Sequence, residues 1–72
     1  MLNVLFPNQI ETSDLIRYYN VYTNKLELGL VVNSQPRFVN KDYMAEVQML
    51  TKIGMQFNIL IRGCILISRV KC

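Results

Sequence analysis

The sequence has no histidine, and this absence removes several kinds of chemistry at once. Catalytic triads and thiol–imidazole pairs need an imidazole as general base, and many protein zinc sites use one as a ligand. The two cysteines, Cys64 and Cys72, lie eight residues apart and form no CxxC pair. We therefore predict a chain with no catalytic residue, no metal site and no cofactor, in which both thiols are reduced.

Glycine, proline and long apolar runs are also scarce. The three glycines stand alone, so the sequence offers no glycine-rich phosphate loop. The apolar opening Met1–Phe6 ends at Pro7, and the apolar stretch Cys64–Ile67 is far shorter than the ~20 residues of a membrane-spanning helix. We expect one cytoplasmic domain over residues 1–72, without a signal peptide and without membrane association.

Charge is sparse and mildly basic. The net charge is +3, and no two basic residues are adjacent in the sequence. Proteins that bind nucleic acid through its phosphates usually cluster Lys and Arg on one face. The scatter predicts that nucleic acid is not the main partner. A weak nucleic-acid contact through Arg37, Lys41 and Lys52 stays open as an alternative.

Hydrophobic spacing predicts helices alternating with strands. Thr12 or Ser13 can cap a helix that continues to Tyr22, because apolar residues recur there at helical spacing. A second helix is predicted from residue 41 or 42 to residue 52, where no Gly or Pro interrupts the pattern.

The remaining apolar segments are expected to form strands around a turn at residues 33–36. These strands are Met1–Phe6, Leu26–Val32, Arg37–Val39 and Phe57–Ile61, with the tail Cys64–Val70 extending the last one or forming another. The order β-α-β-β-α-β indicates an α+β open-faced sandwich, with helices on one side of a sheet.

The second half of the chain carries a spaced set of apolar residues and glycines. Its members are Val39-Asn40, Met44, Leu50, Gly54, Ile59-Leu60-Ile61 and Gly63. This set resembles the histidine-containing phosphocarrier protein family, HPr, in which a Val-Asn pair precedes the helix of the regulatory serine and two glycines bracket the last strand. The resemblance implies an HPr-like fold over about residues 2–63.

The departures from HPr concern its chemistry. The position of the phosphorylated histidine is Thr12, and the arginine that balances the phosphate is replaced by Asp14. A threonine phosphoester is too stable to pass its phosphate on, and a nearby carboxylate repels phosphate. Tyr43 takes the place of the regulatory serine, and the final helix of the family is missing. The resemblance therefore implies a degenerate relative that cannot carry phosphate on histidine.

We accordingly expect a small regulatory module that docks on an unidentified protein partner through its two helices. Its small size would suit a gene of a phage or mobile element. The predicted partner-binding residues are Thr12, Ser13, Arg17, Tyr18, Tyr43, Met44 and Val47. The alternative is a structural or assembly subunit, because an apolar tail offers a strand edge for self-association into a homo-oligomer. The predicted self-association residues are Cys64, Ile65, Leu66, Ile67 and Val70. The competing possibility is that the tail packs inside its own chain.

Overall fold

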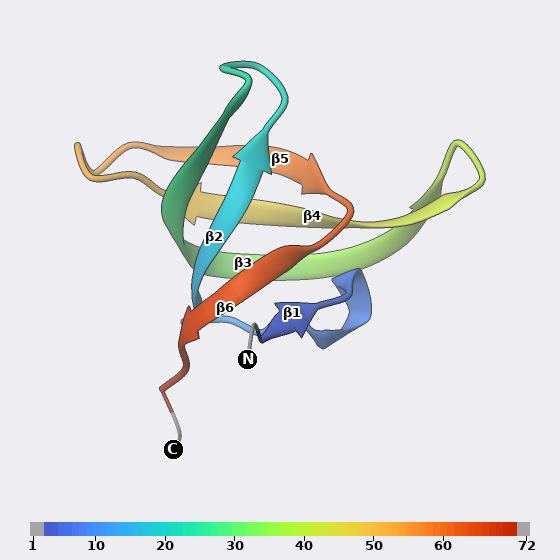
Figure 1. Ribbon diagram of the computed structural model, residues 1–72, viewed down its shortest axis with the longest axis horizontal. Coiled ribbons are helices and arrows are strands. Elements are labelled where there is room, and N and C mark those ends of the chain that lie inside the picture. The colour runs from blue at the N-terminus through green and yellow to red at the C-terminus, as the bar shows by residue number, and fades with distance from the viewer. Residues whose placement is uncertain (1–2, 71–72) are drawn as a thin grey trace.

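Backbone pairing between strands organises this protein. The computed structural model describes residues 3–70. Its elements are β1 (Val4–Leu5), the short 3-10 helix η1 (Pro7–Gln9), β2 (Leu15–Asn20), β3 (Lys25–Val39), β4 (Asp42–Leu50), β5 (Gln56–Ile61) and β6 (Cys64–Ser68). The strands form one antiparallel sheet in the order β1-β6-β2-β3-β4-β5 (Figure 1). Residues 3–70 contain no helix long and apolar enough to cross a membrane.

The predicted first helix is wrong, because its residues form β2 and the turn that follows. Ile16, Tyr18 and Asn20 are buried while Arg17 and Tyr19 are exposed, which is the period-2 alternation of a strand. A segment this short satisfies both periods, and its isoleucine and tyrosines favour a pleated strand. Pairing with β3 on one side and β6 on the other decides the outcome.

The predicted second helix is also wrong, because its residues form β4. Asn40 and Lys41 both have positive φ angles, 49° and 65°, and they make the two-residue loop of a tight hairpin between β3 and β4. Ala45, Val47 and Met49 then alternate into the core, each 0% exposed. The same three residues fit one face of a helix only approximately, whereas they fit one face of a strand fully.

The fold is therefore all-β. The α+β open-faced sandwich and the HPr-like fold are both wrong, since HPr has two helices where this chain has β2 and β4. The expected strands Leu26–Val32 and Phe57–Ile61 lie within β3 and β5, and the tail forms β6. The turn predicted at residues 33–36 is wrong, because β3 runs through it to Val39.

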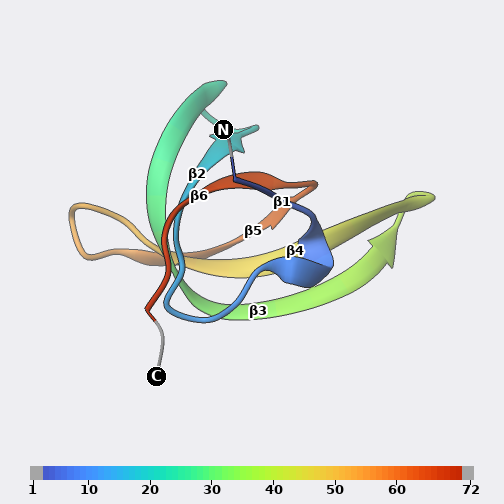
Figure 2. The ribbon, with the colours of Figure 1, turned by 60° about the horizontal axis from the view of Figure 1, so that its bottom comes forward.

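β3 carries the bend on which the shape of the sheet depends. Lys25–Leu30 pairs with β2, and Leu30–Val39 pairs with β4, with a register shift between Val31 and Asn33. A bulge of this kind bends a strand and increases its twist. Figures 1 and 2 show β3 sweeping from the β2 hairpin round to the long β3–β4 arm. One face of the single sheet is thereby turned inward.

The inward face holds one hydrophobic core. Its buried members are Leu5, Ile10, Ile16, Tyr18, Val31, Ala45, Val47, Met49, Ile59, Ile61 and Cys64. Gly29 allows the closest packing at the bend, because a Cβ there would lie 2.9 Å from Met49 Sδ and 3.0 Å from Tyr18 Cε1. A side chain at this position would force the Met49 thioether and the Tyr18 ring to move, so glycine suits the close packing here.

A buried carboxylate joins the segment after β6 to the loop before β2. Asp14 is 0% exposed and accepts hydrogen bonds from Arg69 Nε at 2.8 Å and Nη2 at 2.9 Å. Its Oδ2 also accepts the backbone N–H of Glu11 at 2.9 Å. Arg69 donates to the carbonyl of Gln9 at 2.9 Å and pairs with Glu11.

Removal of this carboxylate should destabilise the fold in a pH-dependent way. Asp14→Ala should lower the free energy of unfolding by about 1.5–3 kcal/mol at pH 7, the range for hydrogen bonds to charged groups. The Arg69 guanidinium, working against the desolvation of Asp14 and aided by the Glu11 N–H, holds the pKa of Asp14 below its ordinary value of 3.8. A lowered folded-state pKa stabilises the protein above 3.8, and this contribution is lost as the pH falls through the folded-state pKa.

Urea titrations from pH 7 down to about pH 2 measure the effect. The difference in the free energy of unfolding between the unmodified chain and Asp14→Ala should become smaller as the pH falls. Asp42→Ala is the matched control, because Asp42 pairs with Arg62 at 3.0 Å through side chains that are 48% and 77% exposed. It should cost less than about 1 kcal/mol. Equal losses at the two aspartates would contradict a special role for Asp14.

Candidate functional site

The predicted partner-binding residues do not form one surface. Tyr18 and Val47 belong to the core, with 2% and 0% of their surface exposed. The others, which are exposed or half-buried, are Thr12, Ser13, Arg17, Tyr43 and Met44. The prediction assumed helices, whose neighbouring turns share a face, whereas successive residues of a strand point to opposite sides. The chain therefore separates these residues between the loop before β2, β2 itself and β4.

The predicted self-association segment is seated in its own sheet. β6 pairs with β2 on one side and with β1 on the other, and Cys64 is 6% exposed. Ile65 and Leu66 are half-buried, while Ile67 and Val70 are exposed. The single chain thus packs its tail within its own sheet. Self-association stays a prediction, and a strand edge is where a second copy could pair.

The sheet ends at β5, which has a partner strand only on the β4 side among the described residues. Its six residues, Gln56–Ile61, include no proline and no charge. Natural edge strands are usually protected by lysine, proline or a bulge, because free backbone groups invite pairing with another chain. β5 therefore presents an unprotected row of donors and acceptors.

The outer half of β3 is a second free edge, and it is protected. β2 pairs with β3 only as far as Leu30, so residues 33–39 have a strand on the β4 side alone within the described chain. Pro36 lacks a backbone donor, and Arg37 adds a charge, paired with Glu46. The contrast between the two edges singles out β5 as the candidate site for strand pairing.

Two aromatic side chains lie together at the end of the β3–β4 arm. Phe38 and Tyr43 are direct cross-strand partners, 71% and 48% exposed, on the face that further along the arm is core. Lys41 lies in the hairpin loop beside them. We call Phe38, Tyr43 and Lys41 the aromatic corner.

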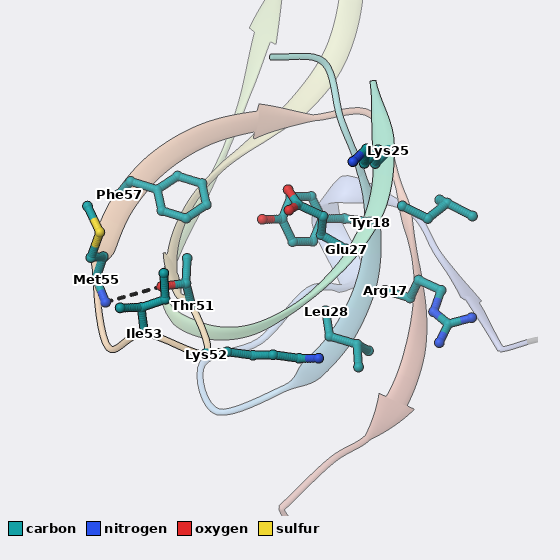
Figure 3. A pocket seen from close by; sticks show the side chains of 11 residues that line it. Arg17, Tyr18, Lys25, Glu27, Leu28, Thr51, Lys52, Ile53, Met55 and Phe57 are labelled. Atoms are coloured by element: carbon teal, nitrogen blue, oxygen red, sulfur yellow. Dashed lines mark hydrogen bonds between the residues drawn. The ribbon is translucent and has the colours of Figure 1, made fainter. Parts of the chain in front are cut away.

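A cavity of about 810 Å³ opens between the β2–β3 hairpin and the loop that precedes β5. Figure 3 shows Phe57, Met55 and Ile53 on one side of it and Tyr18 and Glu27 on the other. Glu27 already accepts hydrogen bonds from Asn20 at 2.6 Å and from Thr23 at 3.3 Å.

The lining of this cavity combines apolar side chains with charged ones. Burial of Tyr18, together with the nearby charge of Glu27, raises the pKa of the tyrosine above its ordinary value of 10.0. Ile53 and Met55 are 85% and 63% exposed at its rim, immediately before β5. A chain paired along β5 would therefore also lie next to this apolar rim.

No group of three or more histidine, cysteine or acidic side chains gathers within residues 3–70 in a way that could hold a metal ion. The chain matches no protein-family model, no curated protein and no solved structure, so the HPr resemblance has no support at the level of family either.

Sequence reasoning missed the two features that now stand out. Phe38 fell inside an expected short strand, and nothing local indicates that its side chain is exposed. The β5 edge does have a signal in the sequence, because residues 56–61 contain no charged residue and no proline. That absence becomes meaningful only when the strand is known to lie at the end of the sheet.

The Cys64 thiol should be inert in the folded protein. Burial, followed by the charge of Asp14, raises the pKa of Cys64 to about 11. At pH 8 roughly one thiol in a thousand would be ionised, against about a quarter for a free cysteine. In a Cys72→Ser background, a colorimetric disulfide reagent should react with Cys64 over a hundredfold faster in denaturant than in buffer. Rapid labelling of the native protein would contradict the buried position.

Proposed function

We propose that this chain is a non-catalytic assembly subunit that binds other protein chains by strand pairing along β5. The protein-binding role expected from the sequence is kept, and its location moves from two helical faces to a sheet edge. The observation that carries the proposal is the unprotected outer edge of Gln56–Ile61.

Two further features support strand pairing at this edge. The side chains of β5 alternate, with Ile59 and Ile61 buried in the core and Gln56 and Asn58 exposed, which fixes its register against β4, while no described strand pairs with its outer edge. The exposed Ile53 and Met55 continue the edge with apolar surface. Backbone hydrogen bonds along an edge give affinity, and neighbouring apolar contacts add to it.

The solution mass tests the proposal. Light scattering at micromolar concentration under reducing conditions should give a multiple of the 8.4 kDa chain mass. Gln56→Lys with Asn58→Lys should return the protein to monomer, because lysines on an edge strand oppose pairing. Both positions are exposed, so the fold should tolerate the changes.

The matched control is Asn33→Lys with Gln35→Lys, the same two residue types at exposed alternate positions on the protected half of β3. This variant should assemble as the unmodified chain does. A monomeric unmodified chain at 100 µM, or equal effects of the two double variants, would refute assembly through β5.

A second candidate function is favoured by the aromatic corner. We propose that Phe38 and Tyr43 stack bases of a single-stranded nucleic acid, with Lys41 beside them facing the phosphates. The observation that favours it is the pairing of two exposed aromatic rings next to a lysine at one hairpin end. Stacking on aromatic rings with nearby positive charge is the usual way to bind single strands without sequence preference.

Fluorescence anisotropy with a labelled oligouridylate tests this second function. Phe38→Ala with Tyr43→Ala should weaken binding by about 1–3 kcal/mol for each stacked base. Affinity should also fall steeply between about 50 and 200 mM salt. Tyr22→Ala, 79% exposed at the β2–β3 turn, is the control and should bind normally. No binding at low salt, or an equal loss with the control, would exclude the aromatic corner as the site.

A further inference from the structure

β1 is the most weakly held strand of the sheet. Within residues 3–70, its ladder consists of Val4 opposite Ile65 and Leu5 opposite Cys64, and the Leu66 N–H donates one more bond to the carbonyl of Asn3 at 2.8 Å. Leu5 is the one side chain of β1 in the core, while Val4 is 56% exposed. Few ladder bonds and little burial make an element easy to displace.

β1 pairs with an edge of β6, and β6 is similar to β5 in length and in its lack of proline and charge. β6 has five residues, Cys64–Ser68, and β5 has six, and neither contains a proline or a charged side chain. The two strands are at or next to opposite ends of the same sheet. Pairing of β5 in one copy with β6 in another would be head-to-tail, so it repeats from copy to copy and forms a ring or a filament.

We infer that β1 is a displaceable cover of the β6 edge, and that the β5 strand of a second copy takes its place during assembly. This inference rests on the proposed assembly function. In the single chain, Val4 and Leu5 cover the β6 edge, which receives the second copy, while the β5 edge has no covering strand. Copies therefore meet in one direction only. The anchor of the cover is the turn at η1, where Gln9 Oε1 accepts the backbone N–H of Phe6 at 2.9 Å.

A reversible covalent lock tests the cover in the full-length chain. Val4→Cys with Ile65→Cys, in a Cys72→Ser background, places a cysteine on each of two directly opposite positions of β1 and β6. Oxidation should lower the association constant at least about tenfold by removing the binding-competent state, and reductant should restore it in the same sample. Tyr19→Cys with Leu26→Cys locks β2 to β3 at a comparable exposed pair and should associate equally in both redox states.

A second variant loosens the cover without a disulfide. Gln9→Ala removes the acceptor that anchors Phe6 and should raise the association constant about two- to tenfold, while Gln35→Ala, also exposed, should leave it unchanged. If assembly depends on β5 but changes neither on oxidation of the disulfide pair nor with Gln9→Ala, then β1 is not a displaceable cover. The proposed assembly function would still stand in that case. A chain that stays monomeric in every variant would overturn both.

Discussion

The structure depends on one constraint, which is that a single sheet with no second layer has to bury its own face. A strand hides its inner side chains only against other side chains, and within residues 3–70 the one helix, η1, has three residues and there is no second sheet. The sheet meets the constraint by curling, with β3 bent between Leu30 and Asn33 so that β2 and β4 approach across the core. Gly29 gives the backbone the space that this approach needs.

The ion pair between Asp14 and Arg69 secures the curled sheet at the point where it closes. β6 must return to β2 after the chain has passed through the whole meander, and Arg69 follows directly after that strand. Its guanidinium occupies both oxygens of a carboxylate that has no access to solvent. A buried charge is tolerated only when it is paired and hydrogen-bonded, so the two residues hold each other in place.

Curling buries the inner face of the sheet but leaves strand edges without a partner. A sheet that does not close fully leaves strands with unpaired backbone groups, and these groups attract other chains. The protein protects the outer half of β3 with Pro36 and Arg37 and covers part of β6 with β1, but β5 has neither device. The proposed functions lie at these exposed ends: strand pairing along β5, and base stacking on the aromatic corner where the arm extends beyond the core.

The sequence could predict the strands Leu26–Val32 and Phe57–Ile61, because β-branched and apolar residues there follow a clear period of two. It could not predict β2 and β4. Over six to nine residues an apolar set such as Ile16, Tyr19 and Tyr22 satisfies helical spacing as well, and the choice falls to pairing with strands elsewhere in the chain. The HPr resemblance failed for the same reason, since spaced hydrophobic residues and glycines are shared by many folds.

The sequence by itself determined that imidazole chemistry is absent and which segments carry no charge. The absence of histidine excludes imidazole catalysis, and the run Gln56–Ile61 carries no charge in any fold that the chain adopts. Only the tertiary structure decided that this run is an edge, that Phe38 lies opposite Tyr43, and that Asp14 meets Arg69 across 55 positions of sequence. The physical reason is that composition and short-range spacing are local properties, whereas edges, cross-strand pairs and buried ion pairs arise from contacts between distant segments.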